Sequence, residues 1–239
     1  MLSPNKLTNK LTSLITAAIF PASCLGCGAD NYWLCRNCIP HVPISHPSEC
    51  PYCRQTTRKF NTCGQCRESG ILNGLWIIGP YVKSWQSIIH HLKYVYLESM
   101  IPDIISIISP RLNAFRQDLD KKTVITAVPI TKQRRLSRGF NQSELLAKEI
   151  AQVMGLKYIP LLKRTGRTKT QSQLTRRGRI DNIKSSMIRT LAVEKMPKFV
   201  IIVDDVYTTG ATIEACAKVL KNHGASNVWG LALARGKYK

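Results

Sequence analysis

Short apolar runs alternate with amphipathic segments over most of the chain after residue 70. The apolar runs are rich in β-branched residues, as in buried parallel strands, and they cover residues 75–81, 124–128, 157–161, 199–203 and 227–234. Between them, apolar residues recur at helical spacing over residues 84–94, 100–115, 142–154 and 212–223. Strands that alternate with helices predict an α/β fold with a mostly parallel sheet and flanking helices.

An acid pair and a threonine-rich turn follow the predicted strand at 199–203. Asp204 and Asp205 are expected at the carboxyl end of this strand, where open α/β sheets bind their ligands. The next residues supply three hydroxyls and one flexible backbone position, namely Thr208, Thr209, Thr212 and Gly210. The helix that begins here directs free N–H groups and its positive dipole end at the turn, which favours a phosphate.

The two carboxylates would repel that phosphate and must face another group. Carboxylate oxygens accept hydrogen bonds from sugar hydroxyls and bind hydrated Mg²⁺. A ligand with a phosphate, a ribose diol and a metal-bound pyrophosphate would satisfy every group in the segment. The alternative is a solvated acid pair with one threonine as a helix N-cap, which explains the cap but not the rest of the pattern.

Eight of the nine cysteines form four Cys-x-x-Cys pairs within the first 70 residues: Cys24/Cys27, Cys35/Cys38, Cys50/Cys53 and Cys63/Cys66. Two such pairs make a closed tetrahedral zinc site, so we predict two structural Cys₄ zinc sites. The pairs are joined either as neighbours in sequence or in a cross-braced order, 24/27 with 50/53 and 35/38 with 63/66. Iron–sulfur ligation is disfavoured because no cluster-specific spacing is present. Metal-bound thiolates indicate a reducing compartment, the cytoplasm.

The net charge of +21 is concentrated in one block. Residues 121–190 contain 17 Lys and Arg against three Asp and Glu, which is +14. One basic segment in this block follows a strand end and is expected near a pyrophosphate; it contains Arg134, Arg135 and Arg138. A second basic segment is too charged for one small ligand and predicts DNA binding; it contains Lys163, Arg164, Arg167, Lys169, Arg176, Arg177 and Arg179. The alternative is a solvated loop that only keeps the protein soluble.

No stable membrane span is expected, because no apolar run approaches the ~20 residues of a transmembrane helix. Residues 11–20 superficially resemble a secretion signal, but the proline before Cys24 and the pairing of Cys24 with Cys27 favour a short amphipathic helix. We therefore expect three parts: an N-terminal helix at 1–22, a double Cys₄ module at 23–70 and the α/β domain at 71–239.

The run VDDVYTTGAT resembles the signature that binds phosphoribosyl pyrophosphate (PRPP) in type I phosphoribosyltransferases. The resemblance implies that domain's fold and catalytic contacts of Asp204 and Asp205 with the ribose hydroxyls and Mg²⁺. It also implies that PRPP is bound by Val206, Tyr207, Thr208, Thr209, Gly210, Ala211 and Thr212, with Arg134, Arg135 and Arg138 near the pyrophosphate.

Over nearly its whole length the chain resembles the ComF family of competence proteins. The resemblance rests on FPASCLGCG, LCRNC, CPYC, CGQC, HHLKY, RGFNQSELLAKEIA and QSQLTRRGRIDNIK. The run SSMIRT at 185–190 departs from the family pattern. Membership implies natural transformation, cytoplasmic handling of incoming single-stranded DNA and a zinc finger before a phosphoribosyltransferase fold.

Three functions are compatible with these patterns. We favour a competence protein that binds single-stranded DNA and also carries a PRPP and Mg²⁺ site. The alternative is an active phosphoribosyltransferase, although no pattern identifies an acceptor. A scaffold that joins DNA-uptake and recombination proteins is the third reading.

Overall fold

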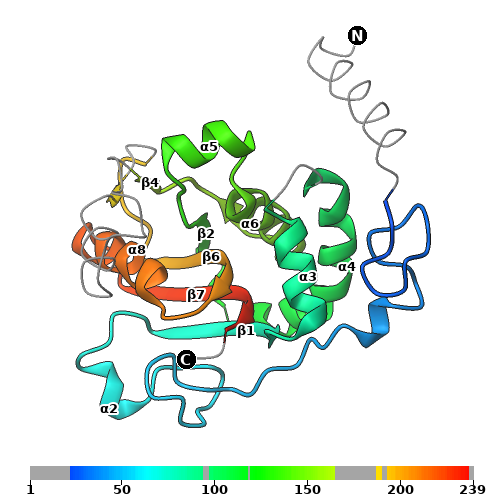
Figure 1. Ribbon diagram of the computed structural model, residues 1–239. Helices are drawn as coiled ribbons and strands as arrows, with labels where there is room; N and C mark the ends of the chain where they lie inside the picture. Colours follow the sequence, from blue (N-terminus) through cyan, green and yellow to red (C-terminus); the bar gives the residue numbers. More distant parts are fainter. Residues whose placement is uncertain (1–21, 94–96, 118, 165–186, 190–192, 237–239) are drawn as a thin grey trace, which may run out of the picture. The chain divides into compact units, whose positions relative to one another are not determined.

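The computed structural model describes residues 22–93, 97–117, 119–164, 187–189 and 193–236 (Figure 1). The chain separates into two compact units, Met1–Val42 and Pro43–Lys239. The predicted helix at 1–22 lies almost entirely outside the described residues. The predicted three-part division at residues 22 and 70 stays a prediction. No helix in the described ranges combines the length and the apolarity that crossing a membrane requires.

The first unit is built from tight turns around its cysteines. Ser23 forms an antiparallel bridge with Asp30, and the N–H of Gly28 donates to the carbonyl of Cys24 at 2.8 Å. Gly28 adopts a φ of 82°, which closes this turn at little cost for a residue without a side chain. A short 3₁₀ helix, η1 (Ile39–His41), ends the unit.

The second unit contains a five-stranded, fully parallel sheet in the order β1-β7-β6-β2-β3. The strands are β1 (Gly74–Pro80), β2 (Val124–Ala127), β3 (Lys157–Tyr158), β6 (Phe199–Tyr207) and β7 (Asn227–Arg235). This result confirms the predicted α/β class and the positions of the predicted strands. The predicted strand at 157–161 is shorter than expected, because only its first two residues pair with β2.

Strand β6 is four residues longer than the apolar run that predicts it. Its pairing with β2 ends at Val203, but its pairing with β7 continues to Tyr207, which lies opposite Arg235. Asp204 and Asp205 therefore lie inside β6 and not after it, which corrects the predicted strand end. Hydropathy misses the extension because backbone pairing with β7 holds these polar residues in the strand.

Helices cover both faces of the sheet, as predicted. They are α3 (Lys83–His91), α4 (Leu97–Arg116), α6 (Gln142–Val153) and α8 (Ala211–Asn222). Ile213 and Leu220 of α8 belong to a buried cluster with Val200 and Ile202 of β6. Figure 1 shows α3, α4 and α6 on the other side of the sheet.

Three sets of short elements among the described residues of the second unit were not predicted. The helix α5 (Lys132–Arg138) follows β2, and its N-cap Thr131 accepts a hydrogen bond from the N–H of Arg134 at 3.2 Å. Strands β4 (Leu162–Arg164) and β5 (Met187–Arg189) pair antiparallel outside the main sheet. The third is the one-turn helix α2 (Gly64–Arg67) before β1.

Candidate functional site

One acid of the pair, Asp204, forms a hollow with the threonine turn at the carboxyl end of β6. Asp204 lines the hollow together with the whole stretch from Val206 to Ile213. Thr208 and Thr209 are exposed, and Oγ1 of Thr209 accepts a hydrogen bond from the N–H of Ala211 at 3.4 Å at the start of α8. The hollow therefore combines one carboxylate, several hydroxyls and a helix amino terminus.

Gly210 is required at the turn for two reasons. It is the N-cap of α8 with a φ of 80°, in the left-handed region that strains other residues. A side chain there would also collide with the ring of Tyr207. That ring is buried, and its hydroxyl donates to the carbonyl of Pro51 at 3.4 Å.

The two aspartates have different partners. Oδ1 of Asp204 accepts hydrogen bonds from Oγ of Ser143 at 3.0 Å and from the N–H of Asp205 at 2.9 Å. Oδ2 of Asp205 lies 3.5 Å from Nζ of Lys93 and 3.5 Å from Nε2 of Gln142. Asp205 is 7% exposed and does not line the hollow, whereas Asp204 does.

Burial raises the pKa of Asp204 to about 8, and the neighbouring charge of Asp205 adds to the shift. The hydrogen bonds that Asp204 accepts oppose the shift but do not cancel it. A cation or a hydroxyl-rich ligand in the hollow would favour the charged form of this carboxylate.

Sequence reasoning missed three residues that contact the acid pair: Lys93, Gln142 and Ser143. The signal was present, because they lie within the HHLKY and RGFNQS motifs. Asn141 sets the start of α6 at the end of β2: its Nδ2 donates to the carbonyl of Val128 at 3.0 Å, and its Oδ1 accepts from the N–H of Ser143 at 3.2 Å.

The three arginines of α5 have different partners. Arg135 pairs with Glu144 at 3.3 Å, and Nη1 of Arg138 donates to Oε1 of Gln142 at 3.2 Å. Arg138 thus reaches the acid pair only through Gln142. Arg134 is exposed, and burial together with the positive charge of Arg134 lowers the pKa of Arg164 on β4.

The predicted DNA-binding residues are only partly described. Lys163 is exposed on β4, whereas Arg164 is half-buried. The other five lie outside the described residues: Arg167, Lys169, Arg176, Arg177 and Arg179.

The eight cysteines form two separate sets of four. Cys24, Cys27, Cys35 and Cys38 make the first set and Cys50, Cys53, Cys63 and Cys66 the second, with all four sulfurs of a set within 4.8 Å of one another. The structure thus joins neighbouring pairs and does not use the cross-braced order. Sulfur–sulfur distances of 3.6 Å, for Cys27–Cys35 and for Cys53–Cys63, fit a tetrahedron around zinc, whose edges are about 3.8 Å at a Zn–S length of about 2.3 Å.

Each sulfur set favours one thiolate and resists further ones. Burial alone would raise the pKa of Cys24, but backbone hydrogen bonds, among them one from the N–H of Cys35 at 3.3 Å, lower it to about 6. Its neighbours then raise the pKa of Cys38 to about 12. Cys50 and Cys66 repeat this pair of shifts. A bound cation would relieve the repulsion among four thiolates, so both sets fit a metal ion.

The second cysteine set is attached to the end of the sheet that carries the hollow. The carbonyl of Pro51, between Cys50 and Cys53, accepts from Tyr207 and also from Nη2 of Arg235 at 3.2 Å. Nη1 of the same arginine pairs with Glu49 at 3.2 Å. The hydroxyl of Tyr52 accepts from the N–H groups of residues 71 and 72 at 2.7 and 2.8 Å.

The sheet, the acid pair and the threonine turn define a phosphoribosyltransferase-type domain. A sequence model described as the phosphoribosyl transferase domain matches residues 141–236. DNA utilization protein YhgH of Escherichia coli K12 is 30% identical over 223 residues, which cover 85% of this chain and 96% of that protein. Competence protein F of Haemophilus influenzae is 25% identical over 84% of this chain and 96% of its own length. Competence protein ComFC of Streptococcus pneumoniae is 26% identical over 86% of this chain and 89% of its own length. The chain belongs to the ComF family of competence proteins.

Replacing Asp204 by Asn should change how stability depends on pH. The unfolded chain releases this proton near pH 4, whereas the folded protein holds it until about pH 8, so wild-type stability falls as pH rises between these values. The unfolding free energy of Asp204→Asn relative to wild type should therefore rise between about pH 5.5 and about pH 8 by at least about 1 kcal/mol. Urea denaturation without divalent cations measures it. Asp205→Asn, which removes the neighbouring charge, should shift the dependence to lower pH, and a pH-independent difference for Asp204→Asn would contradict the assignment.

Replacing Cys53 by Ser should destabilise the unit that contains the sheet. Cys53 and Cys27 are both exposed, so serine at either position removes one sulfur ligand with little effect on packing. Cys53→Ser should lower the stability of this unit by more than about 2 kcal/mol, because loss of a structural metal is among the largest single-site effects. Cys27→Ser should leave this transition in place, since Cys27 belongs to the other unit. Calorimetry with metal analysis tests both, and equal shifts would argue against two independent sites.

Proposed function

We propose that the protein serves natural transformation in the cytoplasm by binding single-stranded DNA, and that it carries a site for PRPP with Mg²⁺. The observation that carries the PRPP proposal is that Asp204 lines the same hollow as the threonine turn at the start of α8. The relatives named competence protein F and DNA utilization protein support the role in DNA handling.

The residues around the hollow match the parts of PRPP. The N–H groups at the start of α8 and the hydroxyls of Thr208, Thr209 and Thr212 suit the 5-phosphate. Asp204 suits the ribose hydroxyls, and bound Mg²⁺ would offset the charge of the pyrophosphate. Asp205 holds its place through Lys93 and Gln142 and contributes to the local charge.

Two arginines are best placed for the pyrophosphate. Arg134 is exposed, and its positive charge acts on Arg164, so we assign these two side chains to the pyrophosphate. Arg135 is less suitable because Glu144 already pairs with it. Arg138 acts through Gln142, which makes it a positioning residue.

DNA binding is supported by charge. The block 121–190 carries most of the net positive charge, and Lys163, which lies on β4 within this block, is exposed. A basic segment of this size neutralises several phosphates and releases their counterions. We assign zinc to both cysteine sets, because four thiolates at these distances are its usual structural ligands.

The match to a phosphoribosyl transferase domain also favours a second candidate, an active transferase. Its reaction would break the bond between C1 of the ribose and the pyrophosphate and form a bond to an acceptor. Pyrophosphate release from PRPP, with and without single-stranded DNA, distinguishes this activity from binding alone.

PRPP binding should depend on Asp204. Asp204→Asn should weaken PRPP binding in the presence of Mg²⁺ by at least about tenfold, which is about 1.4 kcal/mol. Asp120→Asn makes the same chemical change at a residue outside the hollow and should bind as wild type does. Isothermal calorimetry on zinc-loaded protein measures both, and undiminished binding by Asp204→Asn would refute the site.

A second ligand localises the pyrophosphate in the same experiment. Ribose 5-phosphate lacks the pyrophosphate, so Arg134→Gln should weaken PRPP binding and leave ribose 5-phosphate binding unchanged. Equal losses for both ligands would place Arg134 elsewhere in the site.

Single-stranded DNA binding should weaken steeply with salt. Replacing Arg176 and Arg177 together by Ala should make the negative slope of log K against log salt shallower by about 1.4. Each phosphate contact on a single strand contributes about 0.7 to the size of this slope. The double replacement of Lys195 and Lys218 by Ala removes the same charge outside the basic block and should leave the slope near the wild-type value. Fluorescence anisotropy with a labelled oligonucleotide tests this, and identical slopes for the two double variants would exclude the proposed contact.

A further inference from the structure

A second cavity lies at the opposite end of the sheet from the hollow formed by Asp204 and the threonine turn. It measures about 320 Å³, which is within the range of small-molecule sites, about 300–1,000 Å³. Its lining comes from the starts of the parallel strands β1, β6 and β7 and from the segment before β2: Trp76, Phe199, Val200, Ile201, Asn227, Trp229, Leu119, Asp120 and Thr123. Lys59 and Asn61, from the loop between Cys53 and Cys63, complete it.

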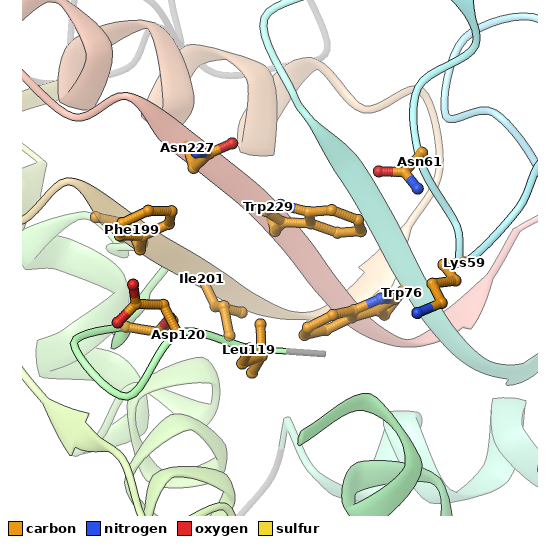
Figure 2. A pocket seen from close by; sticks show the side chains of 11 residues that line it. Lys59, Asn61, Trp76, Leu119, Asp120, Phe199, Ile201, Asn227 and Trp229 are labelled. Carbon is orange, nitrogen blue, oxygen red and sulfur yellow. The ribbon is translucent and has the colours of Figure 1, made fainter. Parts of the chain in front are cut away.

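Aromatic rings form one side of this cavity. Trp76 is buried and stacks on Phe115, with ring centroids 4.8 Å apart and an angle of 6° between the rings. Trp229 lies 5.0 Å from Trp76 at an angle of 36° and is half-buried. Figure 2 shows Trp229 beside Trp76, with Phe199 farther along the lining. Exposed indole surface in a cavity of this size suits stacking with a flat ring.

One residue of the lining also carries a buried hydroxyl without a partner. Thr123 is 3% exposed, and among the described residues its Oγ1 has no hydrogen-bond partner. A buried polar group of this kind lowers stability unless something binds it. The side-chain amides of Asn61 and Asn227 line the same space and offer both donors and acceptors. The cavity is therefore equipped to bind the polar edge of a ring.

The charges of the lining distinguish it from the threonine hollow. Among the described residues, the ionisable ones in its lining are Lys59 and Asp120, which have opposite signs. A lining with no net charge favours an uncharged ligand over a phosphate. Aromatic faces together with amide and hydroxyl groups are the features by which proteins recognise nucleobases.

We propose that this cavity binds a nucleobase, supplied either by a free nucleoside or by single-stranded DNA. Trp229 stacks on the base, and Thr123 and the two asparagines bind its polar edge. The site lies away from the proposed PRPP site, so neither proposal depends on the other.

The test uses Thr123→Val in the full-length, zinc-loaded protein. Valine keeps the shape and removes a hydroxyl that has no partner, so the thermal midpoint should stay the same or rise. Adenosine and thymidine, titrated separately, should quench tryptophan fluorescence in the wild type, and Thr123→Val should weaken binding by about tenfold. Trp229→Leu should reduce binding further, whereas Trp33→Leu, in the other compact unit, should not. PRPP binding should be the same in Thr123→Val as in the wild type.

Two oligonucleotides separate the sources of the base. If the base comes from DNA, an ordinary oligonucleotide should quench the fluorescence and an abasic oligonucleotide of equal length should not. Saturable binding of either nucleosides or the ordinary oligonucleotide, weakened by Thr123→Val, supports the proposal. Equal quenching by the abasic strand, absence of binding by both probes, or unchanged binding in Thr123→Val would overturn it.

Discussion

Strand β6 extends beyond the end of its neighbour β2, and the hollow lined by Asp204 depends on this difference in length. The two strands stop pairing at Val203, so from Asp204 onward one side of β6 lacks a strand neighbour. The amino end of α6 occupies that position, and Ser143 and Gln142 bind the acids there. On its other side β6 still pairs with β7 as far as Tyr207, which keeps the approach to the threonine turn rigid. A carboxylate is thereby held close to a helix amino terminus without being covered by the sheet.

The cysteine-rich segment before β1 supports the same end of the sheet from outside. The carbonyl of Pro51 accepts hydrogen bonds from Tyr207 and from Arg235, which lie opposite each other on the paired strands β6 and β7. The guanidinium of Arg235 also lies 5.4 Å from the centre of the Tyr207 ring. Gly210 packs against that ring. Two residues, Pro51 and Tyr207, therefore connect the second sulfur set to the turn at the start of α8. A metal site placed here would stabilise both the fold and the shape of the hollow.

The two ends of the sheet have different chemistry because parallel strands start at one end and finish at the other. The finishing end brings together the amino ends of α6 and α8 and the cation Lys93, a setting for anions. The starting end brings together Trp76, Trp229 and an unpartnered threonine hydroxyl, a setting for an uncharged ring. The two ends of one sheet therefore offer chemically different surroundings.

Local patterns in the sequence were sufficient for the α/β class, the strand positions, the two groups of cysteines and the threonine turn, because each depends on residues that are close along the chain. Tertiary structure alone decided how far β6 extends, since its last four residues are held by pairing with β7 and not by hydropathy. It alone chose the neighbouring cysteine pairs over the cross-braced order, because both orders use the same spacings. It also brought Lys93 to Asp205 across more than 100 positions, and it gathered Thr123, Trp76 and Trp229 around one cavity. Such contacts depend on the order of strands in the sheet, which no local pattern records.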